Sequence, residues 1–424
     1  MDKFILNQLN KNDKLLKHGL LVLIFSFLTH ILNYVFQLYM GRALGPEQYG
    51  VFGALMSLFY ILSAPASSIN TVLTKFVSNY KSHEEYGKIK TLLIRSFRKL
   101  LIYGVIGFII YLLISSFIAG FLRIETYYVI IIGILVLLTF LVQISNGFLR
   151  GLQKFTWMNV NGLLWTSLKL IFGIIFVSLG LGVLGALIAL NLSVLIGILF
   201  PFIALAFLFK YRKENITNDK SMLYSYGWFL FLGSMFLVML VNGDVILVKR
   251  FFNDSEVGIY NAVSTIAKII WFSSGALITV MFPKVNESFK KGENPSSILR
   301  TSLFYVFLIA VALIVLSFVA PTFIVNTLYG NAYLDAVKLL GLFSVGLGLF
   351  SLSNVLMFYN FGIEKKSFIY AIFGAFVFEA VLISLFHSTL IEVVKIVVGV
   401  NLLLFLFFIF YTREAFGIKN GLTI

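Results

Sequence analysis

The sequence has no cysteine and few charged residues, and these two absences exclude whole classes of protein. A chain without cysteine forms no disulfide and offers no thiolate to a metal. Charged residues make up 12% of the 424 positions, whereas hydrophobic residues make up 60%. Because a soluble domain carries roughly 25% charge, too little polar surface remains to cover a water-soluble globule. The sequence therefore predicts an integral membrane protein.

The motifs of common energy-coupling and catalytic sites are also missing. No G-x-x-x-x-G-K-[ST] pattern occurs, which argues against ATP as the direct driver. No His/Glu spacing suggests zinc, and no nucleophile elbow is found. We therefore expect no catalytic residues, no metal and no cofactor. The net charge of +15 is typical of membrane proteins with basic cytoplasmic loops, so we expect membrane lipids and not nucleic acid as partners.

Long apolar runs dominate the chain. A helix that crosses a bilayer needs about 20 mainly apolar residues, and the runs are too long for the short alternating strands of a barrel. The first run, 20–40, is also too long for a cleaved signal peptide and indicates an uncleaved helix. We predict an all-α protein with twelve transmembrane helices at 18–39, 50–72, 98–120, 127–149, 157–179, 181–209, 223–247, 258–282, 301–325, 333–359, 367–387 and 391–411.

Lysine and arginine alternate between the two sides that these spans define. With the amino end inside, the inside segments hold 25 of the 33 basic residues and the outside loops hold four. Basic residues are enriched on the cytoplasmic side of membrane proteins. This bias predicts that both termini lie in the cytoplasm, and it predicts the cytoplasmic (plasma) membrane as the location.

The two halves of the sequence resemble each other. A shift of 208 residues aligns Arg42 with Arg250, Gly50 with Gly258, and Ala54 with Ala262. A shift of 211 relates the short turns RGLQKF (150–155) and NFGIEKKS (360–367). We predict an internal duplication, with an amino-terminal lobe of six helices at 1–209, a cytoplasmic linker at 210–222 and a carboxyl-terminal lobe of six helices at 223–424. Such repeats typically enclose a cavity that is exposed alternately to each side.

The block GRALGPEQYGVFGALMSL (41–58) resembles the start of the second helix in the Wzx-type polysaccharide flippases. The segment FPKVNES (282–288) and the pair Arg150-Gly151 fit the same family, and the similarity spans the whole chain. The family belongs to a superfamily that also holds multidrug-and-toxin (MATE) extruders and lipid II flippases. The resemblance implies a V-shaped, MATE-like, two-lobe transporter whose helices 1, 2, 7 and 8 line a cavity.

The resemblance also implies a cargo. A polyprenyl-diphosphate-linked oligosaccharide would pass from the cytoplasmic to the outer leaflet by alternating access, for surface polysaccharide biosynthesis. Polysaccharide polymerases or glycosyltransferases are then candidate partners. The sequence has fewer spans than the lipid II flippases and lacks their arginine cluster in the first two helices, so lipid II is a less suitable cargo.

Charges inside the predicted spans are expensive and therefore mark candidate sites. Lys268, near the middle of the eighth span, either attracts the diphosphate of the cargo or forms a structural pair across helices. Arg42 and Arg250, duplicated at the outer rim, either receive the diphosphate on release or extend to the headgroups. Asp244 either faces water, pairs with Lys249 or Arg250, or serves as a cation site for ion coupling.

A polar stripe runs along the first span. His30, Asn33 and Gln37 are spaced for one helix face, and such a stripe faces protein or water rather than lipid. We consider all three as substrate-binding residues. His30 is either a packing residue or a proton-coupling group, because histidine titrates near neutral pH.

Four further features are also assigned roles. Lys169 and Glu379 occupy nearly equivalent depths in the two halves, and we expect structural roles for them within each lobe. Pro65 bends the second helix, either as a hinge of lobe motion or as a fixed kink. The loop 75–99 holds seven basic residues and serves either as an anchor to anionic lipids or as a docking platform for an anionic cargo.

Three functions compete at this point. A flippase for an anionic lipid-linked sugar is favoured, because Lys268 and His30 outweigh the peripheral Asp244 among the deep charges of the predicted cavity helices. The alternative is a cation-coupled multidrug or toxin antiporter of the same fold, which would place acids in the lobe interiors. A membrane-embedded polymerase or glycosyltransferase would need a carboxylate pair or a large outside loop, and all the outside loops are short.

Overall fold

The structure, a computed structural model, describes residues 2–216, 220–365 and 368–416, with side chains from residue 24 onward except those of 220–230 and Glu414. Within these ranges it is helical and has no strand, which confirms the all-α prediction. The α-helices are α1 Asp2–Ser63, α2 Ala66–Ser82, α3 Tyr86–Leu122, α4 Thr126–Gly151, α5 Phe155–Phe176, α6 Gly182–Leu199, α7 Pro201–Leu205, α8 Lys220–Phe251, α9 Asp254–Lys290, α10 Ser296–Val319, α11 Pro321–Leu328, α12 Val337–Gly362, α13 Phe368–Leu385 and α14 Leu390–Tyr411. The shorter turns are η1 Val177–Leu181, η2 Ala206–Lys210, η3 Asn331–Ala336 and η4 Arg413–Phe416.

Ten helical segments among the described residues are long and apolar enough to cross a membrane. The two longest, Ile24–Ser82 and Phe155–Lys210, each contain two of the spans predicted from the sequence. Both are interrupted by glycines with positive φ, at Gly45 in the first and at Gly180 and Gly182 in the second. A multi-pass membrane protein is therefore confirmed, and the number twelve stays a prediction.

The chain forms two compact units. Unit 1 comprises Met1–Leu44 and Leu58–Met235, and unit 2 comprises Gly45–Ser57 and Phe236–Ile424. Residues 45–57, the stretch that follows the glycine kink of α1, thus pack with the second half of the chain. The predicted linker 210–222 falls partly on residues 217–219, which lie outside the described residues.

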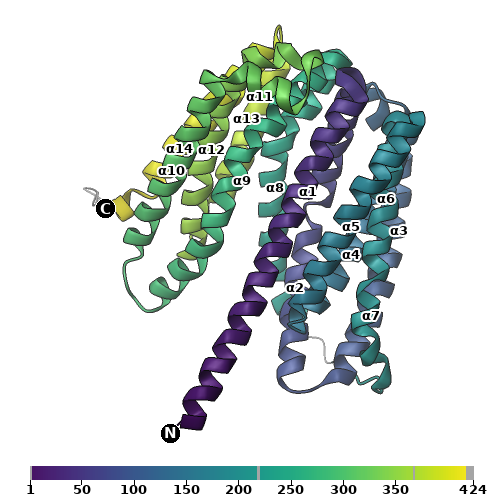
Figure 1. Cartoon of the computed structure of the whole chain (residues 1–424), viewed down its shortest axis with the longest axis vertical. Coiled ribbons are helices and arrows are strands. Elements are labelled where there is room, and N and C mark those ends of the chain that lie inside the picture. Colours follow the sequence, from purple (N-terminus) through teal and green to yellow (C-terminus); the bar gives the residue numbers. More distant parts are fainter. Residues whose placement is uncertain (1, 217–219, 366–367, 417–424) are drawn as a thin grey trace. The chain divides into compact units, whose positions relative to one another are not determined.

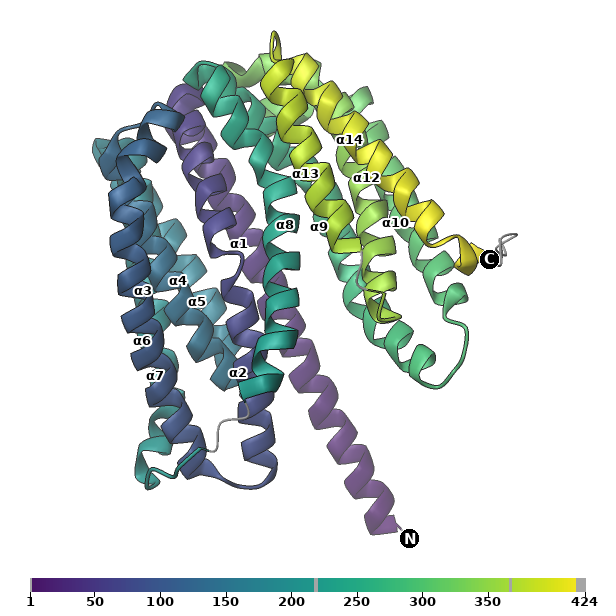
Figure 2. The ribbon, with the colours of Figure 1, turned by 180° about the vertical axis from the view of Figure 1, so that it is seen from behind.

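The two units repeat one packing order. In unit 1, α4 packs against α2, α3 and α6, and α6 packs against α5. In unit 2, α12 packs against α9, α10 and α14, and α14 packs against α13. Figures 1 and 2 show each set as a bundle of steeply inclined helices. The same four pairings recur because equivalent helices bury equivalent faces, as an internal duplication predicts.

The duplication extends to one short turn in atomic detail. Gln153 and Glu364, 211 residues apart, both adopt the left-handed conformation, with φ of 59° and 61°. Their backbone N–H groups donate to the carbonyls of Arg150 and Phe361, which are 211 residues apart as well. Sequence similarity between RGLQKF and NFGIEKKS therefore reflects one turn geometry used twice.

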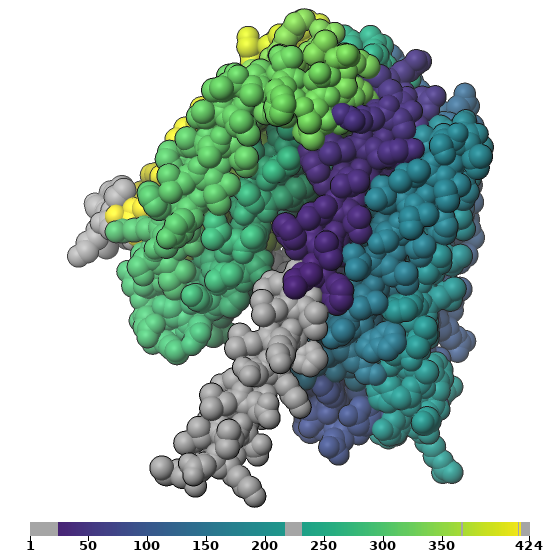
Figure 3. Space-filling model, viewed as in Figure 1, coloured from purple at the N-terminus to yellow at the C-terminus, as the bar shows by residue number. Residues whose placement is uncertain are grey.

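Large apolar side chains cover much of the outer surface of both units. Leu113 and Phe117 of α3 are 80% and 78% exposed, and Val319 at the end of α10 is 78% exposed. Figure 3 shows the side chains of the α9–α10 region forming one face of unit 2. Exposed apolar surface on this scale suits contact with lipid and not with water.

Candidate functional site

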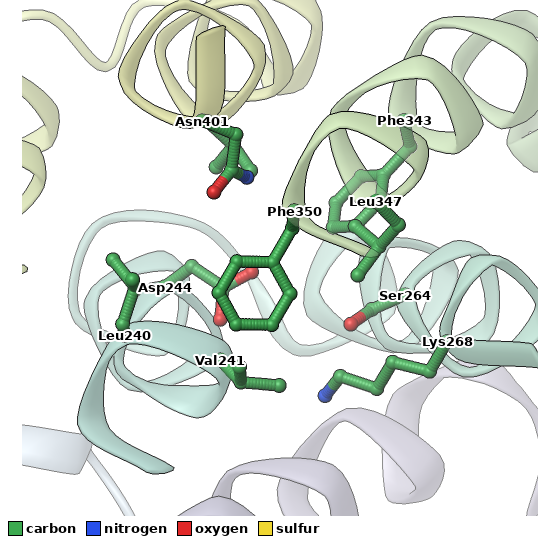
Figure 4. Close-up of a pocket in the computed structure, with 10 residues that line it drawn as sticks. Leu240, Val241, Asp244, Ser264, Lys268, Phe343, Leu347, Phe350 and Asn401 are labelled. Atoms are coloured by element: carbon green, nitrogen blue, oxygen red, sulfur yellow. The ribbon is translucent and has the colours of Figure 1, made fainter. Parts of the chain in front are cut away.

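Unit 2 contains a cavity in its interior. The cavity encloses about 280 Å³ of empty space, its open side included. Four helices, α8, α9, α12 and α14, contribute its walls. The lining residues are Leu240, Val241, Asp244, Ser264, Lys268, Phe343, Leu347, Phe350, Val397 and Asn401 (Figure 4).

Helical spacing explains why these side chains meet. Residues three, four or seven positions apart lie on one face of a helix. Ser264 and Lys268 of α9 are four apart, as are Val397 and Asn401 of α14. Helix α9 begins at a capping box, in which Asn253 Oδ1 accepts from the N–H of Glu256 and the Glu256 carboxylate accepts from the N–H of Asn253. This cap fixes where α9 starts.

Asp244 is the most deeply buried charged residue of the cavity wall. It is 3% exposed, and its Oδ2 accepts a hydrogen bond of 2.7 Å from the hydroxyl of Tyr260. Its Oδ1 is buried and has no hydrogen-bond partner within the described part of the chain. A buried carboxylate oxygen without a donor is costly, so the site favours either a proton on this carboxyl group or a positively charged group beside it.

Lys268 enters the same cavity from α9. It is half-buried, and its ammonium donates a 3.1 Å hydrogen bond to Oδ1 of Asn242 on α8. Lys268 and Asp244 also interact electrostatically, although no ion pair within 4.0 Å joins them among the described residues. Both roles considered for Lys268 are therefore compatible with its position. It has a polar partner on a neighbouring helix, and it also faces a cavity.

Two neutral oxygens and a second acid complete the site. Ser264 Oγ and Asn401 Oδ1 are buried without a hydrogen-bond partner in the described ranges, and both residues line the cavity. Glu379 of α13 is 2% exposed and interacts electrostatically with Asp244. Unit 2 therefore buries two carboxyl groups and one ammonium in a single charge network.

The polar stripe of the first span belongs to a different cluster, in unit 1. Asn33 accepts a hydrogen bond at Oδ1 from the ammonium of Lys169, which also lies over the rings of Phe36 and Trp165 at 4.6 and 5.6 Å. Lys169 is 6% exposed, so its charge is held by an amide and two aromatic faces. His30 is exposed, and the Gln37 side chain is half-buried with Oε1 lacking a partner among the described residues.

The two arginines predicted for the outer rim differ in exposure. Arg42 is exposed and Arg250 is half-buried. Lys249, only 1% exposed, forms an ion pair with Asp254. Lys249 thus pairs with Asp254 and not with Asp244, one of the alternatives considered from the sequence. The carboxylate of Asp244 accepts a hydrogen bond from Tyr260 instead.

Pro65 lies at a break between two helices, whereas the sequence predicted a bend within one helix. Helix α1 ends at Ser63 and α2 begins at Ala66, with Pro65 buried between them. Proline has no N–H to donate to the carbonyl four residues earlier, that of Ile61. The Ser67 hydroxyl donates a 3.0 Å hydrogen bond to the carbonyl of Ala64, the residue before the proline. Pro65 thus lies at a true helix boundary, which suits either a hinge or a fixed kink.

The basic segment 75–99, predicted as a loop, is mostly helical, because α2 extends to Ser82 and α3 begins at Tyr86. Two of its lysines bond to carbonyls at helix ends. Lys90 donates 2.8 Å hydrogen bonds to the carbonyls of Phe209 and Tyr211, and Lys81 donates to that of Leu152 at 3.0 Å. Lysines at helix carboxyl ends satisfy carbonyls that lack an intrahelical donor. Part of the basic charge in this segment is therefore structural.

The sequence analysis missed Ser264, Tyr260 and Asn401 as partners of the charged residues. Asn401 offered a signal, because it is an amide inside the apolar run 390–411, where a polar side chain is expected to face protein. Ser264 gives no signal, because serine is common inside membrane helices.

Comparisons with known proteins agree with this architecture. Residues 15–289 match the family described as polysaccharide biosynthesis protein. A curated relative, an uncharacterized membrane protein of Methanocaldococcus jannaschii, is 23% identical over 289 residues, which is 65% of this chain and 68% of the relative. The chain belongs to the polysaccharide biosynthesis protein family.

Two solved structures share the fold. An inward-facing multidrug resistance MATE family transporter of the MOP superfamily has a TM-score of 0.75 and 15% identity, covering 92% of this chain and 96% of its own. The lipid II flippase MurJ in an inward closed conformation has a TM-score of 0.70 and 16% identity, covering 92% and 87%. The chain is thus a multi-pass membrane protein of the polysaccharide biosynthesis protein family that shares the fold of these two solved structures.

Proposed function

We propose that the protein is a flippase that moves polyprenyl-diphosphate-linked oligosaccharide units across the cytoplasmic membrane by alternating access, with both termini in the cytoplasm. One observation carries the proposal: the half-buried ammonium of Lys268 faces a cavity and is hydrogen-bonded to the neutral amide of Asn242, not to a carboxylate. An ammonium held this way keeps its attraction for an anionic group such as a diphosphate. Membership of the polysaccharide biosynthesis protein family supports the glycan part of the cargo.

The other candidate residues take subordinate roles in this proposal. Arg42 and Arg250 offer guanidinium groups to a diphosphate at the outer rim. The polar first-span residues His30, Asn33 and Gln37 bind hydroxyl groups of the glycan, with Asn33 shared with Lys169. Asp244 or His30 couples an ion, and Pro65 is the hinge. Polymerases and glycosyltransferases that use the same carrier lipid are the proposed partners.

A cation-coupled multidrug or toxin antiporter is the second candidate. The observation in its favour is the burial of Asp244 and Glu379, two carboxyl groups that interact electrostatically inside unit 2. Carboxylates in the interior attract cationic drugs and coupling cations. The two candidates thus differ in the charge of the cargo.

Transport by purified protein in liposomes separates the two candidates. The flippase moves a fluorescent polyprenyl-diphosphate-linked sugar to the opposite leaflet, where an impermeant quencher reports its arrival. The antiporter accumulates a cationic dye against an imposed sodium or proton gradient. Dye accumulation without movement of the lipid-linked sugar overturns the flippase proposal.

A further inference from the structure

The described interior of unit 1 holds a positive charge without a negative one. Lys169 of α5 is 6% exposed, and none of the described acidic side chains interacts with it electrostatically. At nearly the equivalent position of unit 2 the chain has an acid, Glu379. The lysine is therefore not a requirement of the fold that the two units share. The described acidic side chains of unit 1 all lie between or beyond its helices, at Glu84, Glu85, Glu125 and Glu214.

The contacts of Lys169 are those of a charged ammonium. The group lies over the rings of Phe36 and Trp165, 4.6 and 5.6 Å from their centroids, and donates to Oδ1 of Asn33. The face of an aromatic ring attracts a cation electrostatically and so favours the charged form of the lysine. A buried cation that keeps its charge is expensive unless an anion compensates it. Within the described residues, no side chain supplies that anion.

Donor groups for an anion remain on this face of α5. An ammonium can donate more than one hydrogen bond, and the described part of the chain accepts from it at Asn33 alone. Thr166 lies one turn earlier on α5 and is fully buried, and its hydroxyl has no partner among the described residues. Residues three apart lie on one face of a helix. The ammonium and hydroxyl protons are therefore available on the same side of α5.

Helix α1 supplies a further donor and a way in. It packs along α5, because Ser26 donates a 2.9 Å hydrogen bond to Asn159, and a Cβ on Gly173 would meet Phe36. Gln37 lies one turn after Asn33 on α1, and its Oε1 is buried without a partner in the described ranges. Rotation of this amide would present its N–H groups instead. Since Asn33 and Gln37 are half-buried, an ion reaches Lys169 beside them.

We propose that unit 1 binds one chloride-sized monovalent anion between α1 and α5, held by the ammonium of Lys169 and the hydroxyl of Thr166, with the amide of Gln37 as a third donor. One buried positive charge is balanced by one negative charge, and charge-assisted hydrogen bonds from N–H and O–H groups are the strong ones. The near enclosure of Lys169 selects a small ion. Because the ion binds the folded protein, it stabilises unit 1, and its binding does not depend on the cargo of the proposed function.

Binding of radioactive chloride to the full-length protein in detergent tests this inference. Chloride is titrated at pH 7 in a sodium gluconate background, because the bulky gluconate ion does not fit an enclosed site. The wild type is expected to bind chloride saturably, with bromide as a competitor. Lys169→Leu is expected to bind one chloride fewer per chain. Chloride is also expected to raise the unfolding midpoint of the wild type and not that of Lys169→Leu.

Matched variants separate the site from general effects of charge. Lys338→Met removes an exposed lysine of unit 2 that pairs with Asp335, and it is expected to keep all the chloride bound by the wild type. Thr166→Val removes the buried hydroxyl and keeps the branched shape, so we expect chloride affinity to fall about tenfold or more. Ser167→Ala, at the next position of α5, is the control and is expected to keep the wild-type affinity.

Three results overturn the inference. The first is a wild type that binds no chloride, and the second is a Lys169→Leu variant that binds as much chloride as the wild type. The third is an unchanged chloride affinity in Thr166→Val. Elution in size-exclusion chromatography verifies that each variant is folded. No lipid-linked sugar enters these measurements, so the anion site and the proposed function are tested separately.

Discussion

Gly50 and Gly258, equivalent positions of the two repeats, lie against each other within unit 2. A Cβ on Gly50 would overlap the carbonyl oxygen of Asp254, and a Cβ on Gly258 would overlap that of Pro46. Each glycine thus meets the residue four positions before the other, so the contact is reciprocal. Small residues permit such close approach of helices in membranes, and Ala54 and Ala262 continue both small-residue faces. The segment 45–57 is held in unit 2 by this crossing.

Gly258→Ala is therefore expected to destabilise the protein. The added methyl group must displace backbone and not a flexible side chain, which costs about 1–3 kcal/mol for overpacking. Thermal unfolding of the detergent-solubilised protein, followed by size-exclusion chromatography, measures the loss as a lowered midpoint. Gly275→Ala in the same helix is the control, because a Cβ there meets no atom within 4 Å. Equal midpoints for the two variants contradict the close crossing.

The two repeated turns are expected to respond differently to glycine. Glu364 has φ of 61°, a conformation that glycine adopts without strain, so Glu364→Gly is expected to stabilise the protein by up to about 1 kcal/mol. Gln153 has φ of 59°, but its side-chain oxygen accepts a 2.8 Å hydrogen bond from Lys81. Gln153→Gly loses this bond, and its gain is expected to be cancelled. A larger gain in the unfolding midpoint for Gln153→Gly than for Glu364→Gly refutes this account.

Lys169 and Asn33 are expected to act as a structural pair in unit 1. Asn33→Leu removes the acceptor of a buried ammonium, which costs about 1–3 kcal/mol, more than a solvent-exposed change. Adding Lys169→Leu to this variant removes the ammonium that has lost its acceptor. The double variant Asn33→Leu/Lys169→Leu is therefore expected to be more stable than Asn33→Leu alone. Unfolding midpoints of the two single variants and the double variant form the cycle.

A functional role for Lys169 would give a different pattern. Lys169→Leu would then abolish transport of the lipid-linked sugar while the unfolding midpoint stayed at the wild-type value. That outcome would reject the structural assignment.

Within the basic segment 75–99, lysines that bond to helix ends are expected to affect stability, whereas exposed basic residues are expected to affect lipid binding. Lys90→Gln loses hydrogen bonds to the carbonyls of Phe209 and Tyr211, so we expect a lowered unfolding midpoint. Arg98→Gln is the comparison, and it is expected to keep the midpoint and to weaken binding to vesicles that contain anionic lipid. Vesicle co-flotation of nanodisc-embedded protein measures that binding. Equal losses of stability in both variants contradict the division.

The repeat was predictable from the sequence because it leaves local marks. Val77 and Val285 are 208 residues apart and align in the sequence. In the structure, Val77 packs against Gly151 and Val285 packs against Gly362. A Cβ added to either glycine would lie only 2.6 Å from Val77 or 2.7 Å from Val285. The same small residue recurs because the same helices approach closely in both units. Because turns and close helix contacts require particular residue types, their repetition in the two units is visible when the two halves of the sequence are compared.

The partners of the buried charges were not predictable in the same way. Lys268 has no acid within one turn in the sequence, and it meets Asp244 only because α8 and α9 pack side by side. Asn33 and Lys169 are 136 residues apart, and the sequence alone placed them in separate roles. Helical periodicity tells which face a residue occupies, whereas the facing helix depends on packing of the whole unit.

The role of Lys268 in cargo binding is tested most directly by flipping of a polyprenyl-diphosphate-linked sugar in proteoliposomes. Wild type, Lys268→Met and Lys338→Met are reconstituted at equal density, and arrival of the sugar at the opposite leaflet is timed. The account predicts that Lys268→Met loses at least about tenfold in rate, which corresponds to about 1.4 kcal/mol of lost interaction with the diphosphate, while Lys338→Met keeps the wild-type rate. A wild-type rate in Lys268→Met would contradict the account.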